Sequence, residues 1–269
     1  MSLAAPARVT VPVAASAALG PLLARPAEGA ILGAGESGAW ARLGDTVVVL
    51  LPPGVPRAPH GVVVPPTLLV GLEPGTACRV DAGRFEVAGW RLEVRASWDP
   101  RPRLPRVDAT VLREWAREVS SRFVPAADQG MGAALGAHDV GGVLAAASRL
   151  IGRGPGLTPL GDDLLAGTMG AAVLLGEAAG DRWLLSLAAD LAEPLDSLAR
   201  ERTTALSTTL LRHARRGEVD DASAALLQAL CGRGDAAAAL AALLEVGHSS
   251  GTGLAGGILA AAACAGGAE

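Results

Sequence analysis

Two hydrophobic patterns divide this chain near residue 105. Before that point, short apolar runs rich in Val are separated by turns rich in Gly and Pro; the runs are 9–13, 30–32, 46–51, 61–64, 67–70, 84–87 and 90–94. The last two alternate apolar and polar residues around Ala88-Gly89, which is typical of a β-hairpin. Short runs at this spacing predict a small all-β unit, a barrel or sandwich, within which residues 14–24 could form a short helix.

After residue 105, apolar residues recur every three or four positions, which is the pattern of amphipathic helices. We expect Asp108 to cap the first helix and glycines to mark the joints between helices. The expected helices cover 108–123, 138–151, 160–178, 181–199, 201–216, 219–231, 235–246 and a stretch from about Gly251. A proline-rich segment, 98–105, predicts a linker. The predicted fold class is α+β, with a β-rich domain over 1–105 and an all-α domain over 106–269.

Composition excludes several classes of function. The net charge is −4 and aromatic residues are few, so no basic, base-stacking surface for nucleic acid is expected. Lys, Asn and Tyr are absent, which excludes Schiff-base and P-loop lysine chemistry. The three cysteines are widely spaced, which argues against a disulfide framework or a cysteine metal site and indicates a reducing, cytoplasmic location.

No segment has the pattern expected of a membrane anchor. Residues 1–13 lack the basic and then apolar regions of a signal peptide. The stretch 246–268 carries no charged residue and has the length of a membrane span. It is built mostly of Ala and Gly behind a polar start, so we expect a buried helix there instead.

The densest cluster of unusual residues is the run GRGPGLTPLGDD at 152–163, directly before an apolar helix. Glycines let a backbone adopt positive φ and approach a ligand closely. Thr158 is expected at the N-cap and Pro159 at the first helical position, which places Asp162 and Asp163 in the first turn. A well-capped core helix would explain part of this run. Four glycines and two carboxylates in so short a stretch favour a binding site.

A weak internal repeat supports that interpretation. Residues 161–167 align without gaps over 251–257, with Gly, Leu and the last Gly in common, and each copy follows a loop with hydroxyl side chains. We expect the two helix N-termini to lie side by side and point at one pocket. Two such ends form an anion site without a basic side chain. Chance matching in a chain rich in Ala and Gly is the alternative.

Other residues are candidates for proton transfer or charge recognition. His248 lies in the second loop and could act as a general acid or base, or be a hydrogen-bonded structural residue. Asp162 and Asp163 could hold Mg²⁺ with phosphate oxygens, although adjacent helical residues diverge and only one is expected to face a ligand. The other histidines lack partners at metal-ligand spacing. We therefore expect no metal ligand set and no cofactor, with Mg²⁺ as the minority alternative.

The start of a later helix offers a second cluster. Two arginines, Arg200 and Arg202, stand just before the hydroxyl side chains of Thr204, Ser207 and Thr208. This run suggests either an exposed charged cap of the helix or a site where an arginine holds a carboxylate through two hydrogen bonds. Arg153 in the glycine loop is a similar candidate. The complete set of candidate anion-binding residues is Arg153, Gly154, Gly156, Leu157, Thr158, Gly161, Arg202, Thr204, Ser207, Ser249, Ser250, Gly251 and Thr252, with His248, Asp163 and Asp162 as candidate catalytic residues.

The run from Gly152 to Gly167 resembles the signature of the AllH-like family, and GHSSGT at 247–252 resembles that family's C-terminal element. The resemblance covers about 150–260 and departs at Gly253, where relatives tend to carry Asp. It implies a subunit of a bacterial oxamate carbamoyltransferase of allantoin breakdown. That complex interconverts oxalurate plus phosphate with oxamate plus carbamoyl phosphate, and works with two other subunits.

The resemblance gives the candidate residues a common task. Loop N–H groups and the hydroxyls of Thr158, Ser249, Ser250 and Thr252 would hold phosphate, carbamoyl phosphate or oxamate. An arginine would hold the substrate carboxylate, and His248 or one aspartate would move a proton. Two alternatives stay open: a non-catalytic anion-binding or assembly subunit, and a Mg²⁺-dependent hydrolase or phosphoryl-transfer enzyme.

Overall fold

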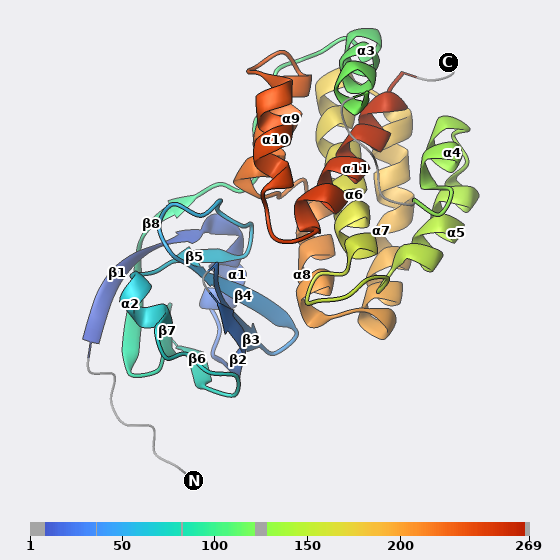
Figure 1. The fold of residues 1–269 in the computed structure, drawn as a ribbon. Coiled ribbons are helices and arrows are strands. Elements are labelled where there is room, and N and C mark those ends of the chain that lie inside the picture. The colour runs from blue at the N-terminus through green and yellow to red at the C-terminus, as the bar shows by residue number, and fades with distance from the viewer. Residues whose placement is uncertain (1–8, 36, 82, 122–127, 267–269) are drawn as a thin grey trace. The chain divides into compact units, whose positions relative to one another are not determined.

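The computed structural model describes residues 9–35, 37–81, 83–121 and 128–266. The chain divides into two compact units, Met1–Pro100 and Arg101–Glu269 (Figure 1). The first is built on strands and the second on helices, so the fold class is α+β, as the two hydrophobic patterns predict.

The first unit contains a closed eight-stranded barrel, in the order β1-β5-β4-β3-β2-β6-β7-β8. Most neighbours are antiparallel, while β1 with β8 and β4 with β5 run parallel. The strands are β1 (Val9–Ser16), β2 (Ala27–Gly35), β3 (Gly38–Leu43), β4 (Thr46–Leu51), β5 (Gly61–Val63), β6 (Ala77–Asp81), β7 (Arg84–Val87) and β8 (Trp90–Trp98). Closure leaves no exposed sheet edge, which protects such a unit from pairing with other chains.

The predicted β7–β8 hairpin is confirmed. Val87 pairs with Trp90, and the turn between them takes positive φ at Ala88 (48°) and Gly89 (81°). Two central residues with positive φ match the twist of the flanking strands. Phe85 and Leu92 then point into the barrel core, where both are almost fully buried.

The sequence prediction was wrong at 67–70. That run forms the short helix α2 (Pro66–Leu69), which Pro65 precedes as N-cap. Proline at the first helical position is pre-organised for a helix and cannot donate to a strand ladder. Residues 14–24 are only partly helical, because β1 continues to Ser16 before η1 (Ala17–Leu19) and α1 (Gly20–Leu23). Strands β3 and β6 were not predicted.

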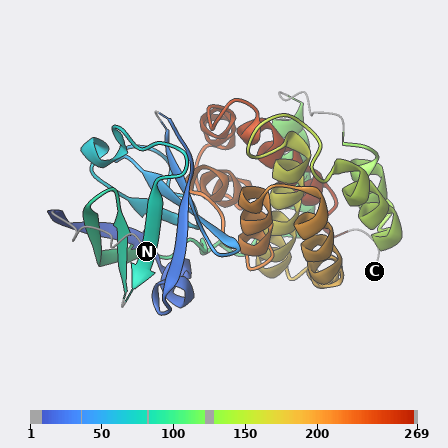
Figure 2. The same cartoon turned by 90° about the horizontal axis from the view of Figure 1, so that it is seen from below.

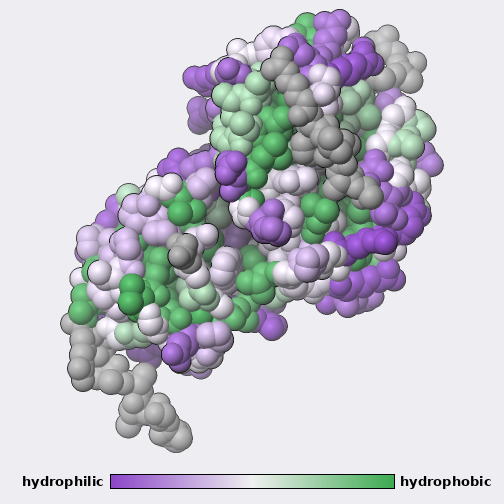
Figure 3. Space-filling model, viewed as in Figure 1, coloured by the Kyte–Doolittle hydropathy of each residue, from purple (hydrophilic) through white to green (hydrophobic). Residues whose placement is uncertain are grey.

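The second unit is a helical bundle around α6. Its helices are α3 (Ala109–Ser120), α4 (Met131–Gly136), α5 (Val140–Leu150), α6 (Leu160–Ala179), α7 (Arg182–Arg202), α8 (Ala205–Ala214), α9 (Asp221–Leu230), α10 (Ala236–Leu244) and α11 (Ser250–Ala263). Sixteen of the twenty residues of α6 are buried, against α5, α7, α8, α9 and α11. Figures 1 and 2 show α6 running among the other helices of this unit. Figure 3 shows hydrophilic surface along the right-hand edge of the unit.

The helix predictions hold with shifted ends. Asp108 caps α3, as expected, by accepting hydrogen bonds from two backbone N–H groups. Helix α4 was not predicted. Helix α7 continues past Pro194 to Arg202, which moves its joint with α8 to Thr203-Thr204. Residues 99–108 form neither helix nor strand, in agreement with the predicted linker.

Two glycines show how closely α6 and α11 approach. A Cβ added at Gly257 of α11 would lie 2.1 Å from the backbone oxygen of Leu164, and one at Gly167 of α6 would lie 2.3 Å from that of Leu254. Backbone therefore packs on backbone, which only glycine permits at these positions. The uncharged stretch after residue 246 is accordingly a buried helix. In the described part of the chain no helix is long and apolar enough to cross a membrane.

Candidate functional site

The glycine loop, residues 151–159, joins α5 to α6. Three of its glycines take positive φ: Gly152 (71°), Gly154 (124°) and Gly156 (96°). A Cβ at Gly152 would lie 2.2 Å from the backbone oxygen of Arg202, so the loop begins pressed against the end of α7. From there the segment 153–157 is exposed.

Hydrogen bonds from the α7–α8 joint fix the shape of this loop. The carboxylate of Asp162 accepts from the N–H of Gly152 at 2.7 Å and from the hydroxyl of Thr203. The hydroxyl of Thr204 donates to the carbonyl of Leu157 at 2.6 Å. Both ends of the exposed segment are thus fastened to one joint. Asp162 acts here by positioning the loop.

The start of α11 lies beside the start of α6, as the repeat predicted. The hydroxyls of Thr158 and Ser250 form a hydrogen bond of 2.8 Å across the two starts. A Cβ at Gly253 would lie 2.8 Å from the carbonyl oxygen of Leu160, so the helices touch within their first turns. The N-cap of α11 is Ser249, whose side chain makes no capping bond.

The two helix starts differ in the donors that they offer. In α6 the N–H groups of Gly161, Asp162 and Asp163 already donate to loop carbonyls, and the N-cap is Pro159. The predicted N-cap role of Thr158 is therefore wrong, and α6 contributes few free donors. Among the described residues of the two loops and helix starts, the N–H groups that donate no hydrogen bond are those of Gly154, Gly156, Leu157, Thr158, Leu160, Gly247, His248, Ser249, Ser250 and Thr252. Gly251, in the first turn of α11, donates to the Val246 carbonyl at 2.9 Å.

Asp163 is the most buried acid of the site. Its side chain is 1% exposed, and its Oδ2 atom has no hydrogen-bond partner among the described residues. Burial raises the pKa of Asp163 to about 8. The hydroxyls of Ser250 and Thr158 oppose this shift, whereas the charges of Asp162 and Asp220 add to it. At neutral pH the folded protein thus favours the neutral acid.

Ser207 is a second buried polar group without a partner. It lies in the first turn of α8, where its N–H donates to the N-cap hydroxyl of Thr204 at 3.0 Å, while its own hydroxyl is unpaired among the described residues. Burial raises the pKa of Asp162, and the Thr203 hydroxyl, the Gly152 N–H and the Ser207 hydroxyl partly offset it. The Ser207 hydroxyl therefore lies near Asp162 without forming a hydrogen bond to it in the described structure.

Two side chains on the loops are free to meet a ligand. Arg153 and His248 are both exposed, and neither forms a side-chain hydrogen bond or ion pair with any described residue. Thr252, four residues after His248, is half-buried. These groups can reach an anion at the loops, but no residue in the described part of the chain orients the imidazole of His248.

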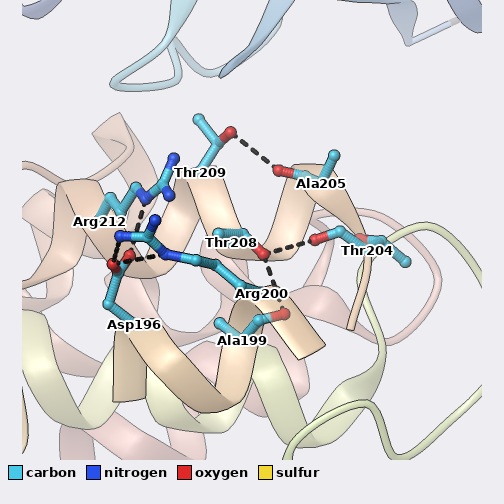
Figure 4. A network of polar contacts seen from close by, with 8 residues as sticks. All are labelled: Asp196, Ala199, Arg200, Thr204, Ala205, Thr208, Thr209 and Arg212. Atoms are coloured by element: carbon cyan, nitrogen blue, oxygen red, sulfur yellow. Dashed lines mark hydrogen bonds and ion pairs between the residues drawn. The ribbon is translucent and has the colours of Figure 1, made fainter. Parts of the chain in front are cut away.

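The arginines near the α7–α8 joint are already paired. Arg200 and Arg212 both bind the buried carboxylate of Asp196, as Figure 4 shows. Arg202 instead donates to the carbonyl and hydroxyl of Ser148 on α5. The predicted carboxylate clamp at Arg200 or Arg202 is therefore not formed. The hydroxyl of Thr208 is likewise bound to backbone carbonyls (Figure 4).

A metal site at the paired aspartates finds no support. Within the described ranges no three His, Cys, Asp or Glu side chains gather as a metal ion would require. Both oxygens of Asp162 accept hydrogen bonds, which leaves them directed at the loop. Elsewhere His213 binds Glu218 at 2.5 Å, and His138 stacks on Trp183, which fits the structural role expected for the other histidines.

Sequence reasoning missed two residues of this site. Thr203 holds Asp162 from 41 residues away, and Asp220 at the start of α9 acts on Asp163 through its charge. Asp220 looks in the sequence like an ordinary helix cap, a role it also has, since it accepts from the N–H groups of Ala222 and Ser223. Nothing in its neighbours along the chain indicates the second role.

Comparison with known proteins gives one result for this region. The family model described as oxamate carbamoyltransferase subunit AllH matches residues 150–262. No curated protein and no solved structure matches the chain. The matched segment begins just before the glycine loop and ends within α11, so it contains both loops of the site. Over residues 150–262 the chain is therefore similar to the AllH family, as its two glycine-rich motifs predict.

Proposed function

We propose that this chain is a subunit of an oxamate carbamoyltransferase-like enzyme and that it binds small anions between the glycine loop and the start of α11. The observation that carries the proposal is the extent of the family match, which includes both loops that the Thr158–Ser250 hydrogen bond joins. The reaction interconverts oxalurate plus phosphate with oxamate plus carbamoyl phosphate.

The donors of the site suit such anions. The unpaired N–H groups of Gly154, Gly156 and Leu157 face a ligand from one loop, and those of Ser250 and Thr252 from the first turn of α11. The positive end of the α11 dipole adds to their attraction for negative charge. Arg153 is exposed and offers a two-pronged guanidinium to a carboxylate.

The proposed chemistry requires no covalent intermediate on the protein. A phosphate oxygen attacks the carbamoyl carbon of oxalurate, a tetrahedral oxyanion forms, and the bond from that carbon to the oxamate nitrogen breaks. The leaving nitrogen takes up a proton to give oxamate. The site contributes by holding two anions together and by stabilising the oxyanion with N–H groups. His248 or Asp163 would supply the proton.

We further propose that other chains complete the enzyme. The matching family is named as a subunit, and the site described above is open at an exposed loop. In this proposal the present chain supplies anion binding, and partner subunits supply the rest of the catalytic surface. A cytoplasmic location stays a prediction.

Thermal unfolding of the purified chain against oxamate, oxalurate, phosphate and carbamoyl phosphate tests the proposal. A ligand at about a hundred times its Kd adds about 2.7 kcal/mol to the stability of a folded state that alone binds it. For a helical unit of this size that corresponds to a Tm increase of about 5–10 °C. No increase with any of the four anions would overturn the assignment of the anion site to this chain.

Variants then locate the binding. Ser250→Ala removes the hydroxyl that bridges the two helix starts, and Arg153→Ala removes the free guanidinium; each should reduce the ligand-induced increase in Tm. Ser186→Ala is the matched control, because this exposed serine on α7 bonds only the carbonyl of Trp183 in its own helix. If the control loses as much of the ligand-induced increase in Tm, or if both site variants keep all of it, the anion does not bind between the glycine loop and the start of α11.

A further inference from the structure

We propose that the site binds its anion together with a proton, which Asp163 carries as a neutral carboxylic acid and presents to the ligand as a hydrogen-bond donor. This inference rests on the proposed anion site, and assigns to it a pH-dependent affinity. It separates the two adjacent aspartates: Asp162 positions the glycine loop, and Asp163 interacts with the ligand.

The packing around Asp163 leaves its carboxyl group buried and incompletely bonded. A Cβ at Gly253 would lie 2.7 Å from the Cβ of Asp163, so α11 covers the side chain directly. Its Oδ2 atom is buried and makes no hydrogen bond within the described structure. A native protein rarely leaves such an atom unpaired unless water, an ion or a ligand completes it. A ligand at the helix starts would supply the missing partner.

The two hydroxyls next to Asp163, those of Thr158 and Ser250, can donate few hydrogen bonds to the carboxyl group or to a ligand. Thr158 and Ser250 have one hydroxyl proton each, and their mutual hydrogen bond uses one of them. One proton remains, for either the carboxyl group or the ligand. An ionised Asp163 would compete with the anion for it, because both are acceptors only. A neutral Asp163 adds a proton to the group and removes the competition.

The charged residues around Asp163 also favour its neutral form. On α6 the nearest is Asp162, and the other is Asp220, the N-cap of α9. Helix α11 carries no charged side chain, and the first turn of α8 carries none either. Among the residues of the two loops, Arg153, Glu245 and His248 are exposed. A buried negative charge on Asp163 would therefore add to the charges of Asp162 and Asp220 and repel the incoming anion. Protonation removes that repulsion.

Oxamate is a suitable probe, because its carboxylate stays ionised throughout the range from pH 6.5 to pH 9.5. Titration calorimetry of the full chain should show an affinity that is nearly constant below pH 7.5 and falls toward tenfold per pH unit above the pKa of Asp163, about 8. Measured in buffers of different ionisation enthalpy, binding at pH 9 should take up close to one proton per oxamate.

Two variants complete the test. Asp163→Asn keeps a neutral donor of the same shape, so its oxamate affinity should vary less than threefold over the whole range with no proton uptake. Asp221→Asn removes a neighbouring exposed charge on α9 and should keep the wild-type pH profile. If Asp163→Asn fails to fold, the proton uptake of the wild-type chain at pH 9 still tests whether the anion binds together with a proton.

The outcomes distinguish this inference from the proposed function. Wild-type binding with the same affinity from pH 6.5 to pH 9.5 would overturn the role of Asp163 and leave the anion site standing. A pH dependence that persists in Asp163→Asn would also overturn it, as would a requirement for Mg²⁺, since a cation would then replace the proton. No oxamate binding at any pH would instead refute the anion site itself.

Discussion

The close contact between α6 and α11 can be tested with a single methyl group at Gly257. A Cβ there would lie 2.1 Å from the carbonyl oxygen of Leu164 and 2.5 Å from the amide nitrogen of Thr168. Both obstacles are backbone atoms of α6, so no side chain can rotate away. In Gly257→Ala the helices must separate locally by about 1.3 Å before the contact reaches an ordinary 3.4 Å.

The magnitude follows from what such a separation disrupts. A gap of about 0.5–1 Å already forfeits roughly a quarter to a half of each dispersion contact along an interface. Overpacking a well-packed core typically costs about 1–3 kcal/mol, and a backbone obstacle places this site at the upper end. Alanine gains up to about 1 kcal/mol over glycine within a helix. We therefore expect a net loss of about 2 kcal/mol or more.

Urea unfolding followed by circular dichroism at 222 nm measures this loss, because the signal comes mainly from the helical unit. The matched control is Gly136→Ala at the end of α4, where an added Cβ meets nothing within 4 Å. It should be neutral or stabilising by up to about 1 kcal/mol. If Gly257→Ala is as stable as the control, the two helices are not packed backbone to backbone and the placement of the second loop beside the first loses its support.

Three further predictions concern the carboxylates, each measured by urea unfolding unless stated. Because the pKa of Asp163 is raised in the folded state, the unfolded chain releases the proton of this carboxyl group at a lower pH than the folded chain does. The free energy of unfolding should therefore fall by up to about 1.4 kcal/mol per pH unit between about pH 4 and pH 8. Asp163→Asn should remove that slope. Burial alone would raise the pKa of Asp196, but hydrogen bonds from Arg212 and Arg200 hold it below its usual range. Asp196→Asn should thus cost about 1.5–3 kcal/mol at pH 7, and this cost should shrink as the pH falls through the lowered pKa of Asp196 in the parent chain; a cost that does not change with pH would refute the ion-pair argument. Asp162→Ala should cost about 1–3 kcal/mol and speed amide hydrogen exchange across the glycine loop, with Asp221→Asn as the unaffected control.

Local pattern was enough to predict most of the elements. Most helices of the second unit were predictable because their apolar residues recur at helical spacing and because caps mark some of their limits, as Asp108 does at the start of α3 and Gly180 at the end of α6. The β7–β8 hairpin was predictable because its two-residue turn is encoded locally. Strand β3 was missed because its sequence, GAWARL, contains small residues at positions that are buried only once the barrel closes.

The candidate site was only partly predictable, because its key contacts join distant segments. The repeat at 161–167 and 251–257 correctly placed two helix starts together, since small residues at matching positions allow close approach. The same reasoning overestimated the donors of α6. The loop folds back so that Arg153 and Pro159 present their carbonyls to the first turn. The contact between Thr204 and Leu157, which holds that fold, spans 47 residues and has no local signal.

The glycine at position 253, where the resemblance leads one to expect Asp, shows how the two helix starts divide their tasks in this chain. Any side chain there would strike the Cβ of Asp163 at 2.7 Å and the carbonyl of Leu160 at 2.8 Å, so an Asp would need the helices to move apart. Gly253 instead lets α11 pack directly against the Cβ of Asp163. Helix α6 then supplies the buried acid and α11 supplies the unpaired N–H groups. The absence of a second acid does not weaken such a site, because an additional carboxylate beside Asp163 would add to the repulsion that a bound anion already meets from Asp162 and Asp220.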